Sequence, residues 1–188
     1  MKVYCGASIV TLATIILAVP LCRAQKPEKS GIVFDQGAGK MMQSRDVAFA
    51  LNAAQVLAGE EQLAALAIKQ AGPAVKQFAE RLSAENRKIA RDLRDTAAKM
   101  QLTLPKNATQ QDLSQRGDLL KRSGLKFDAV FANNLVTDSR EDLASFQKEA
   151  KKGKNPEMKS FAARALPVLR ARFDTVKALR AKLKSAGA

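Results

Sequence analysis

Five polar residues interrupt the apolar faces of helical patterns in this 188-residue sequence: Glu60, Asn86, Ser139, Asp142 and Arg172. Each lies towards the middle of its segment, so a helical bundle would bring them into one interior layer. Buried charges cost free energy unless they are paired and hydrogen-bonded. The pattern predicts one of two arrangements. Either Arg172 bridges to Glu60 or Asp142 while Asn86 completes the hydrogen bonds, or several of these residues lie at a partly solvated edge.

The composition excludes several kinds of chemistry. The sequence has no His, no Trp, one Tyr and two Cys. Without His there is no Ser-His-Asp triad, no Cys-His nucleophile and no His-ligated zinc or haem. Two carboxylates without His or Cys would hold a transition metal poorly. We therefore expect no catalytic residue, no metal and no cofactor, and a protein that is not an enzyme.

The elements that must position these residues are helices. Apolar residues recur at helical spacing over residues 46–70, 73–101, 110–122, 127–152 and 157–183. Gly72-Pro73, Pro105, Gly124 and Gly153 with Pro156 mark the breaks. Alternating β-branched runs and two-residue hairpins are missing. The sequence predicts an all-α domain over residues 45–185, built as a four-helix bundle with one short extra helix.

The N-terminal segment has the pattern of a secretory signal peptide. In residues 1–24, Lys2 precedes an apolar stretch from Ile9 to Val19, and Cys22 and Ala24 are small residues at a cleavage site. A membrane anchor is the alternative, but the apolar stretch is well short of the roughly 20 residues that span a bilayer. We expect cleavage after Ala24 and export to the periplasm, with the protein free there or attached peripherally to the outer membrane. Residues 25–44, rich in Gly, Lys and Ser, are expected to be a flexible lead.

The last quarter of the chain is strongly basic. The formal net charge is +14, and the segment from Lys148 to the C-terminus has 12 basic residues against 3 acidic ones. Such a surface suits an anionic membrane or lipopolysaccharide, although a solvated face that only keeps the protein soluble is the alternative. Nucleic acid is a weaker expectation, because no aromatic residues interleave with the cations and no binding module is recognised. No small-molecule substrate is indicated. The expected contact residues are Lys148, Lys151, Lys152, Lys154, Lys159, Arg164, Arg170, Lys177, Lys182 and Lys184.

Four segments carry a family resemblance: VKQFAERLSAEN (75–86), MQLTLP (100–105), SGLKFDAVF (123–131) and FAARALPVLRARF (161–173). Their order and spacing resemble an uncharacterised family of exported bacterial proteins, a domain of unknown function usually described as outer-membrane or periplasmic. The resemblance covers roughly residues 46–183 and implies a ferritin-like four-helix bundle. Glu60 fits a glutamate in the family's first helix.

The chain departs from that family at three positions. The family typically has His where this sequence has Asn86, Ser139 and Arg172. If typical members hold a metal with those imidazoles, the resemblance implies that this chain does not. We expect Arg172 to supply a fixed positive charge where a cation would lie.

The sequence thus predicts an exported, non-enzymatic helical bundle whose basic last helix contacts anionic envelope components. The resemblance implies a stress-related accessory role. One alternative is a ferritin-like metal-binding protein or oxidoreductase, against which the missing histidines weigh. The other is a basic protein that binds nucleic acid.

Overall fold

The computed structural model describes residues 44–187. The predicted signal peptide, and the predicted lead up to residue 43, lie outside the described residues. Within them the chain forms five helices and no strand: α1 (Ser44–Gln70), α2 (Pro73–Lys99), α3 (Gln110–Leu120), α4 (Gly124–Lys152) and α5 (Pro156–Ser185). The prediction of an all-α fold with four long helices and one short one is confirmed.

The connections between helices follow from local side-chain chemistry. Pro73 occupies the first turn of α2, where a missing N–H costs nothing. Thr109 and Asp112 form a reciprocal capping box at the start of α3. Gly124 has a φ of 55°, a conformation that glycine adopts without strain. It lets α4 begin after a turn of only three residues that follows α3, earlier than the predicted start at Phe127.

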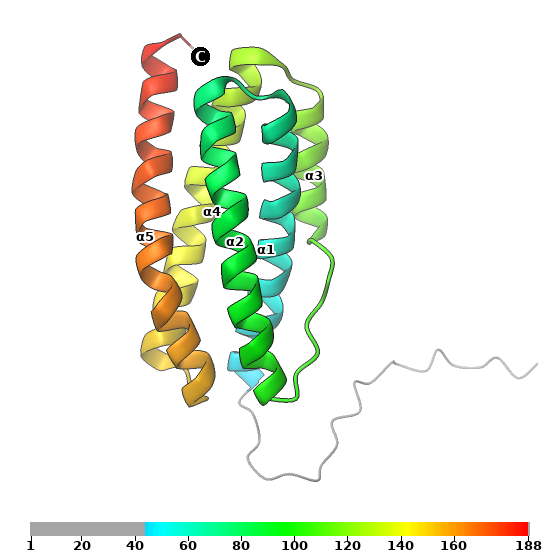
Figure 1. Cartoon of the computed structure of the whole chain (residues 1–188), viewed down its shortest axis with the longest axis vertical. Helices are drawn as coiled ribbons and strands as arrows, with labels where there is room; N and C mark the ends of the chain where they lie inside the picture. Colours follow the sequence, from blue (N-terminus) through cyan, green and yellow to red (C-terminus); the bar gives the residue numbers. More distant parts are fainter. Residues whose placement is uncertain (1–43, 188) are drawn as a thin grey trace, which may run out of the picture. The chain divides into compact units, whose positions relative to one another are not determined.

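The long helices form two antiparallel pairs. α1 pairs with α2 and α4 pairs with α5, while α2 also lies against α5 and α1 against α4. Figure 1 shows the connection after α2 leaving one end of the bundle and running back beside α1 to α3. A single long crossover between the second and third long helices is the connectivity of ferritin-like bundles.

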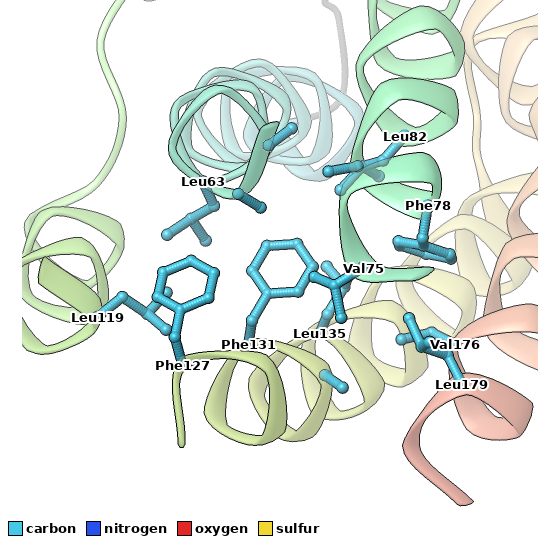
Figure 2. Packing of buried hydrophobic residues seen from close by; sticks show 14 of the residues in the cluster. Leu63, Val75, Phe78, Leu82, Leu119, Phe127, Phe131, Leu135, Val176 and Leu179 are labelled. Carbon is cyan, nitrogen blue, oxygen red and sulfur yellow. The ribbon is translucent and has the colours of Figure 1, made fainter. Parts of the chain in front are cut away.

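The apolar core is divided into two blocks along the bundle. The first block contains Leu63 of α1, Phe78 of α2, Phe131 of α4 and Val176 of α5, and α3 covers it with Leu119. Figure 2 shows these side chains converging between the helices.

The second block lies towards the other end of the same helices. It is built around Phe49, Phe146 and Phe161, and the rings of Phe49 and Phe146 meet edge to face with centroids 5.0 Å apart. Edge-to-face aromatic pairs add stability beyond their buried area. The residues between the two blocks are the polar ones that interrupt the apolar faces.

Candidate functional site

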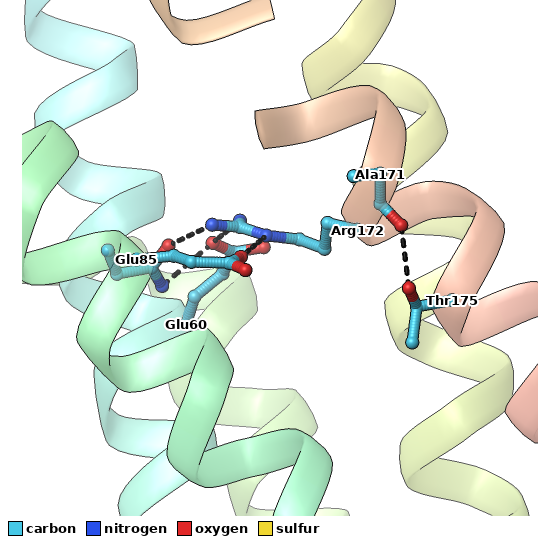
Figure 3. A network of polar contacts seen from close by, with 6 residues as sticks. Glu60, Glu85, Ala171, Arg172 and Thr175 are labelled. Atoms are coloured by element: carbon cyan, nitrogen blue, oxygen red, sulfur yellow. Dashed lines mark hydrogen bonds and ion pairs between the residues drawn. The ribbon is translucent and has the colours of Figure 1, made fainter. Parts of the chain in front are cut away.

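A buried arginine organises the layer between the two core blocks. The guanidinium of Arg172 on α5 donates from one terminal nitrogen to Glu60 Oε2 at 2.9 Å and from the other to Asn86 Oδ1 at 2.7 Å. Its Nε donates to Glu85 Oε2 at 3.1 Å. Figure 3 shows this side chain reaching from α5 to Glu60 and Glu85. All three nitrogens of the guanidinium thus have partners.

Glu60 and Asn86 complete the connection between the hairpins. Asn86 Nδ2 donates to Glu60 Oε2 at 2.9 Å, so that oxygen accepts from both Asn86 and Arg172. Glu60, Asn86 and Arg172 are each at most 3% exposed. Because they lie on α1, α2 and α5, the network fixes how the α1–α2 hairpin sits against α5.

The two predicted residues on α4, Ser139 and Asp142, do not join the hydrogen-bond network around Arg172 in the described part of the chain. Ser139 is buried, but its Oγ has no hydrogen-bond partner among the described residues, and Asp142 is partly buried. Asp142 makes no hydrogen bond to Arg172 in that part of the chain; the arginine pairs with Glu60 instead. Burial raises the pKa of Asp142 well above its ordinary value, and the charge of Glu60 raises it further, while Arg172 lowers it.

Two further carboxylates belong to this region that the sequence reasoning missed. Glu85 binds Arg172, as described above, although it lies just outside the apolar arc of α2. Asp138 has a pKa raised to about 6, chiefly by burial, although a hydrogen bond with Gln115 lowers it. The spacing offered a signal for Asp138, which follows Phe131 by seven residues and precedes Asp142 by four.

The arrangement does not resemble a metal centre. Over residues 44–187, no group of three or more His, Cys, Asp or Glu side chains is positioned to hold a metal ion. The cation at the centre is Arg172, whose donors are already taken by carboxylate and amide oxygens. The resemblance described above implies a histidine at three positions of this chain. The residues at two of them, Asn86 and Arg172, are in direct contact.

The predicted basic surface residues are all exposed. None of the ten side chains from Lys148 to Lys184 forms an ion pair within the described part of the chain. Lys177 Nζ lies 5.2 Å from the centre of the Phe173 ring, a cation–π contact one turn along α5. These cations are therefore available to an external partner.

The fold and the polar layer define a class: an all-α, ferritin-like four-helix bundle with a charged network in place of a continuous apolar core. The chain belongs to the family described as "Domain of unknown function (DUF4142)", which matches residues 33–179. It is also similar to the crystal structure of a DUF305 fragment from Deinococcus radiodurans, with a TM-score of 0.66 and 13% sequence identity. That similarity covers 75% of this chain and 98% of the other, and it shows the shared fold. No curated protein sequence matches the chain.

Proposed function

We propose that this protein is an exported, periplasmic helical bundle without enzymatic activity, whose α5 binds anionic components of the cell envelope by charge. The observation that carries the proposal is a row of cations along α5. Lys159, Arg170, Lys177 and Lys184 are exposed and are spaced by eleven, seven and seven residues. At 100° per residue these positions fall within about 40° of one another, on one flank of the helix.

The row of cations is long enough to contact an extended anionic surface rather than a single small anion. From Lys159 to Lys184 the helix rises about 38 Å at 1.5 Å per residue. Lys148, Lys151, Lys152 and Lys154 add exposed cations where α4 turns into α5. A basic helix face of this kind is attracted to anionic headgroups by roughly 1 kcal/mol for each cation near the surface.

Export rests on residues 1–24, whose short basic start, apolar stretch and small residues before Gln25 suit signal-peptide cleavage. Among the described residues, no helix has both the length and the hydropathy needed to cross a bilayer. Protein recovered from a periplasmic extract should have the intact mass of a chain that begins at Gln25. Recovery of the uncleaved chain in the cytoplasmic fraction would contradict export.

The surface proposal is tested by co-sedimentation of the purified protein with phosphatidylglycerol vesicles and with lipopolysaccharide, at low and high salt. The variant K159Q/R170Q/K177Q/K184Q removes the row. With about 1 kcal/mol lost per cation, its affinity should fall by at least about a hundredfold. High salt should weaken the binding of the original protein, because exposed charges are screened.

A matched control removes the same charge elsewhere. Lys69, Lys76, Lys88 and Lys126 are exposed and lie on α1, α2 and α4. The variant K69Q/K76Q/K88Q/K126Q should keep most of the binding. Equal loss in both variants would show that only net charge matters, and binding to duplex DNA without binding to vesicles or lipopolysaccharide would overturn the proposal.

A further inference from the structure

A groove on the α1–α2 hairpin, which does not include α5, has the features of a ligand site. It lies between α1 and α2, is bordered by the connection after α2, and has a volume of about 660 Å³, within the range of small-molecule sites. The helices can form it because their facing residues are small or apolar, which leaves room between them. Its floor and walls include Ala54, Leu57, Ala58, Ala90, Ala97 and Leu102.

Cations line the same groove. Arg87, Arg91 and Arg94 lie along one face of α2, and Lys106 comes from the connection that follows it. Arg87 pairs with Glu61, but no carboxylate of the described residues forms an ion pair with Arg91, Arg94 or Lys106. An apolar floor therefore runs beside three cations without partners in that part of the chain.

The contact made by Arg87 indicates which anion the other arginines suit. Its Nε and a terminal nitrogen both donate to Glu61 Oε1, at 3.1 and 3.0 Å. Arg91 and Arg94 present the same planar donors one and two turns further along α2. Two donors of Arg87 thus converge on a single carboxylate oxygen, and charge-assisted contacts between arginine and carboxylate are among the stronger hydrogen bonds.

We propose that the groove binds a fatty-acid-type amphiphile, a single acyl chain that ends in a carboxylate. The acyl chain would lie on the alanine and leucine floor, and the carboxylate would bind Arg91 and Arg94. A ligand without a tail would leave the apolar floor unused, and a neutral ligand would leave the cations unused. The lead of the chain itself is a poor occupant, because residues 25–43 contain more basic than acidic residues.

This inference does not depend on the proposed surface of α5. The groove residues belong to α1, α2 and the connection after α2, and none of them is in the row Lys159, Arg170, Lys177 and Lys184. A protein that failed to bind vesicles could still bind the amphiphile, and the reverse also holds.

The test is isothermal titration of the purified protein with three probes: dodecanoate below its micelle concentration, dodecanol and acetate. Dodecanoate should bind once per chain and saturate. Dodecanol, which has the tail without the charge, and acetate, which has the charge without the tail, should each bind at least about tenfold more weakly. Dodecanol binding as tightly as dodecanoate, or several dodecanoate molecules binding per chain without saturation, would overturn the inference.

Two variants locate the site. R91Q/R94Q should weaken dodecanoate binding by about tenfold or more, because it removes both proposed carboxylate donors. The matched control R116Q/R140Q removes two exposed arginines, one from α3 and one from α4, that belong neither to the groove nor to the α5 surface, and should leave binding unchanged.

A third variant tests the floor independently of charge. Ala58→Leu places a larger side chain in the groove and should reduce dodecanoate binding while leaving the helical circular dichroism spectrum intact. If R91Q/R94Q and R116Q/R140Q bind dodecanoate equally well, or if A58L binds it as tightly as the original protein, the ligand does not occupy this groove.

Discussion

The guanidinium of Arg172 and the carboxylate of Glu60 form an ion pair at 2.9 Å with side chains only 1% and 3% exposed. The pair joins α5 to α1 at a layer between two apolar core blocks. One oxygen of Glu60 accepts from Arg172 and Asn86, whereas the other, Oε1, has no partner among the described residues. The buried carboxylate of Glu60 is therefore stabilised by the hydrogen bonds to one of its two oxygens and by the charge of Arg172.

The first prediction concerns removal of that charge. Arg172→Met should lower the free energy of unfolding by about 3–5 kcal/mol, because Glu60 would remain buried without its cation. Urea denaturation followed by circular dichroism measures the change. Arg170→Met is the matched control, since Arg170 is exposed on the same helix, and it should change stability by less than about 0.5 kcal/mol. Similar losses of unfolding free energy in Arg172→Met and Arg170→Met would show that the ion pair between Arg172 and Glu60 does not stabilise the fold.

A double variant separates the pair from the buried charge. Glu60→Leu combined with Arg172→Met replaces both partners by apolar side chains. Such replacements of buried ion pairs are often neutral or stabilising. The double variant should therefore recover part of the stability lost in Arg172→Met, but not all of it, because the buried amide of Asn86 then has neither Glu60 nor Arg172 as a partner. A double variant no more stable than Arg172→Met would contradict this prediction.

The helices and their order could be predicted because each depends on short-range signals. Gly72-Pro73 ends one helix and begins the next, and Asn155 with Pro156 starts α5. Apolar spacing then indicates which face is buried, as at Phe49, although Val56, seven residues further along the same helical face, is only partly buried. The start predicted at Phe127 is wrong by three residues: α4 begins at Gly124, because the left-handed backbone of this glycine allows the chain to reverse within a short turn after α3.

The polar layer was harder to derive, because partners are chosen across helices. Spacing along α1, α2 and α5 placed Glu60, Asn86 and Arg172 on inward faces. It did not show whether Arg172 would reach Glu60 or Asp142, since that depends on how α5 is rotated against its two neighbours. Glu85 lies outside the apolar arc of α2 and still binds Arg172, because a long side chain can reach inward from the edge of a helix face.

The second prediction concerns the pH dependence of stability. In the folded protein the pKa of Asp138 is raised from 3.8 to about 6, mainly by burial. The folded state thus holds the proton more tightly than the unfolded chain does. The stability that the protonated form provides is present below about pH 4 and is lost as pH rises towards 6.

Asp138→Asn should remove this dependence. Because Asp138 is only partly buried, we expect the variant to be more stable than the original protein at pH 7.5 by about 1–2 kcal/mol. The difference should shrink as the pH falls to 4, and chemical denaturation at both pH values measures it. Asp95→Asn, at an exposed position on α2, is the control. A constant difference between Asp138→Asn and the original protein from pH 4 to 7.5 would contradict the assignment.

The third prediction concerns the junction of α1 and α2. The backbone N–H of Gly72 donates to both oxygens of Asp128 on α4, at 3.0 and 3.2 Å, and Asp128 is buried. Asp128→Ala leaves this N–H without an acceptor at the start of α2 and removes a favourable charge there. The free energy of unfolding should fall by about 2 kcal/mol. Asp128→Asn keeps an acceptor oxygen and should lower the free energy of unfolding by less than Asp128→Ala does. Thermal unfolding of the two variants in parallel measures the difference, and a larger loss in Asp128→Asn would contradict the prediction.

The fourth prediction uses two glycines with opposite surroundings. A Cβ added at Gly59 on α1 would lie 2.3 Å from Cγ of Asp112, the residue that forms the capping box of α3 with Thr109. A Cβ added at Gly117, inside α3, would meet nothing within 4 Å. Gly59→Ala must therefore displace Asp112 and weaken the start of α3, whereas Gly117→Ala only removes backbone freedom from the unfolded chain.

Gly117→Ala should raise the free energy of unfolding by about 0.4–1 kcal/mol, because alanine is the better helix former. Gly59→Ala should lower it by about 1–3 kcal/mol, as overpacking does. Urea denaturation measures both, and hydrogen exchange would locate the loss in Gly59→Ala to the amides at the start of α3, with α5 unaffected. A stabilising effect of Gly59→Ala would contradict this prediction. It would mean that Asp112 at the start of α3 does not pack closely against Gly59 of α1.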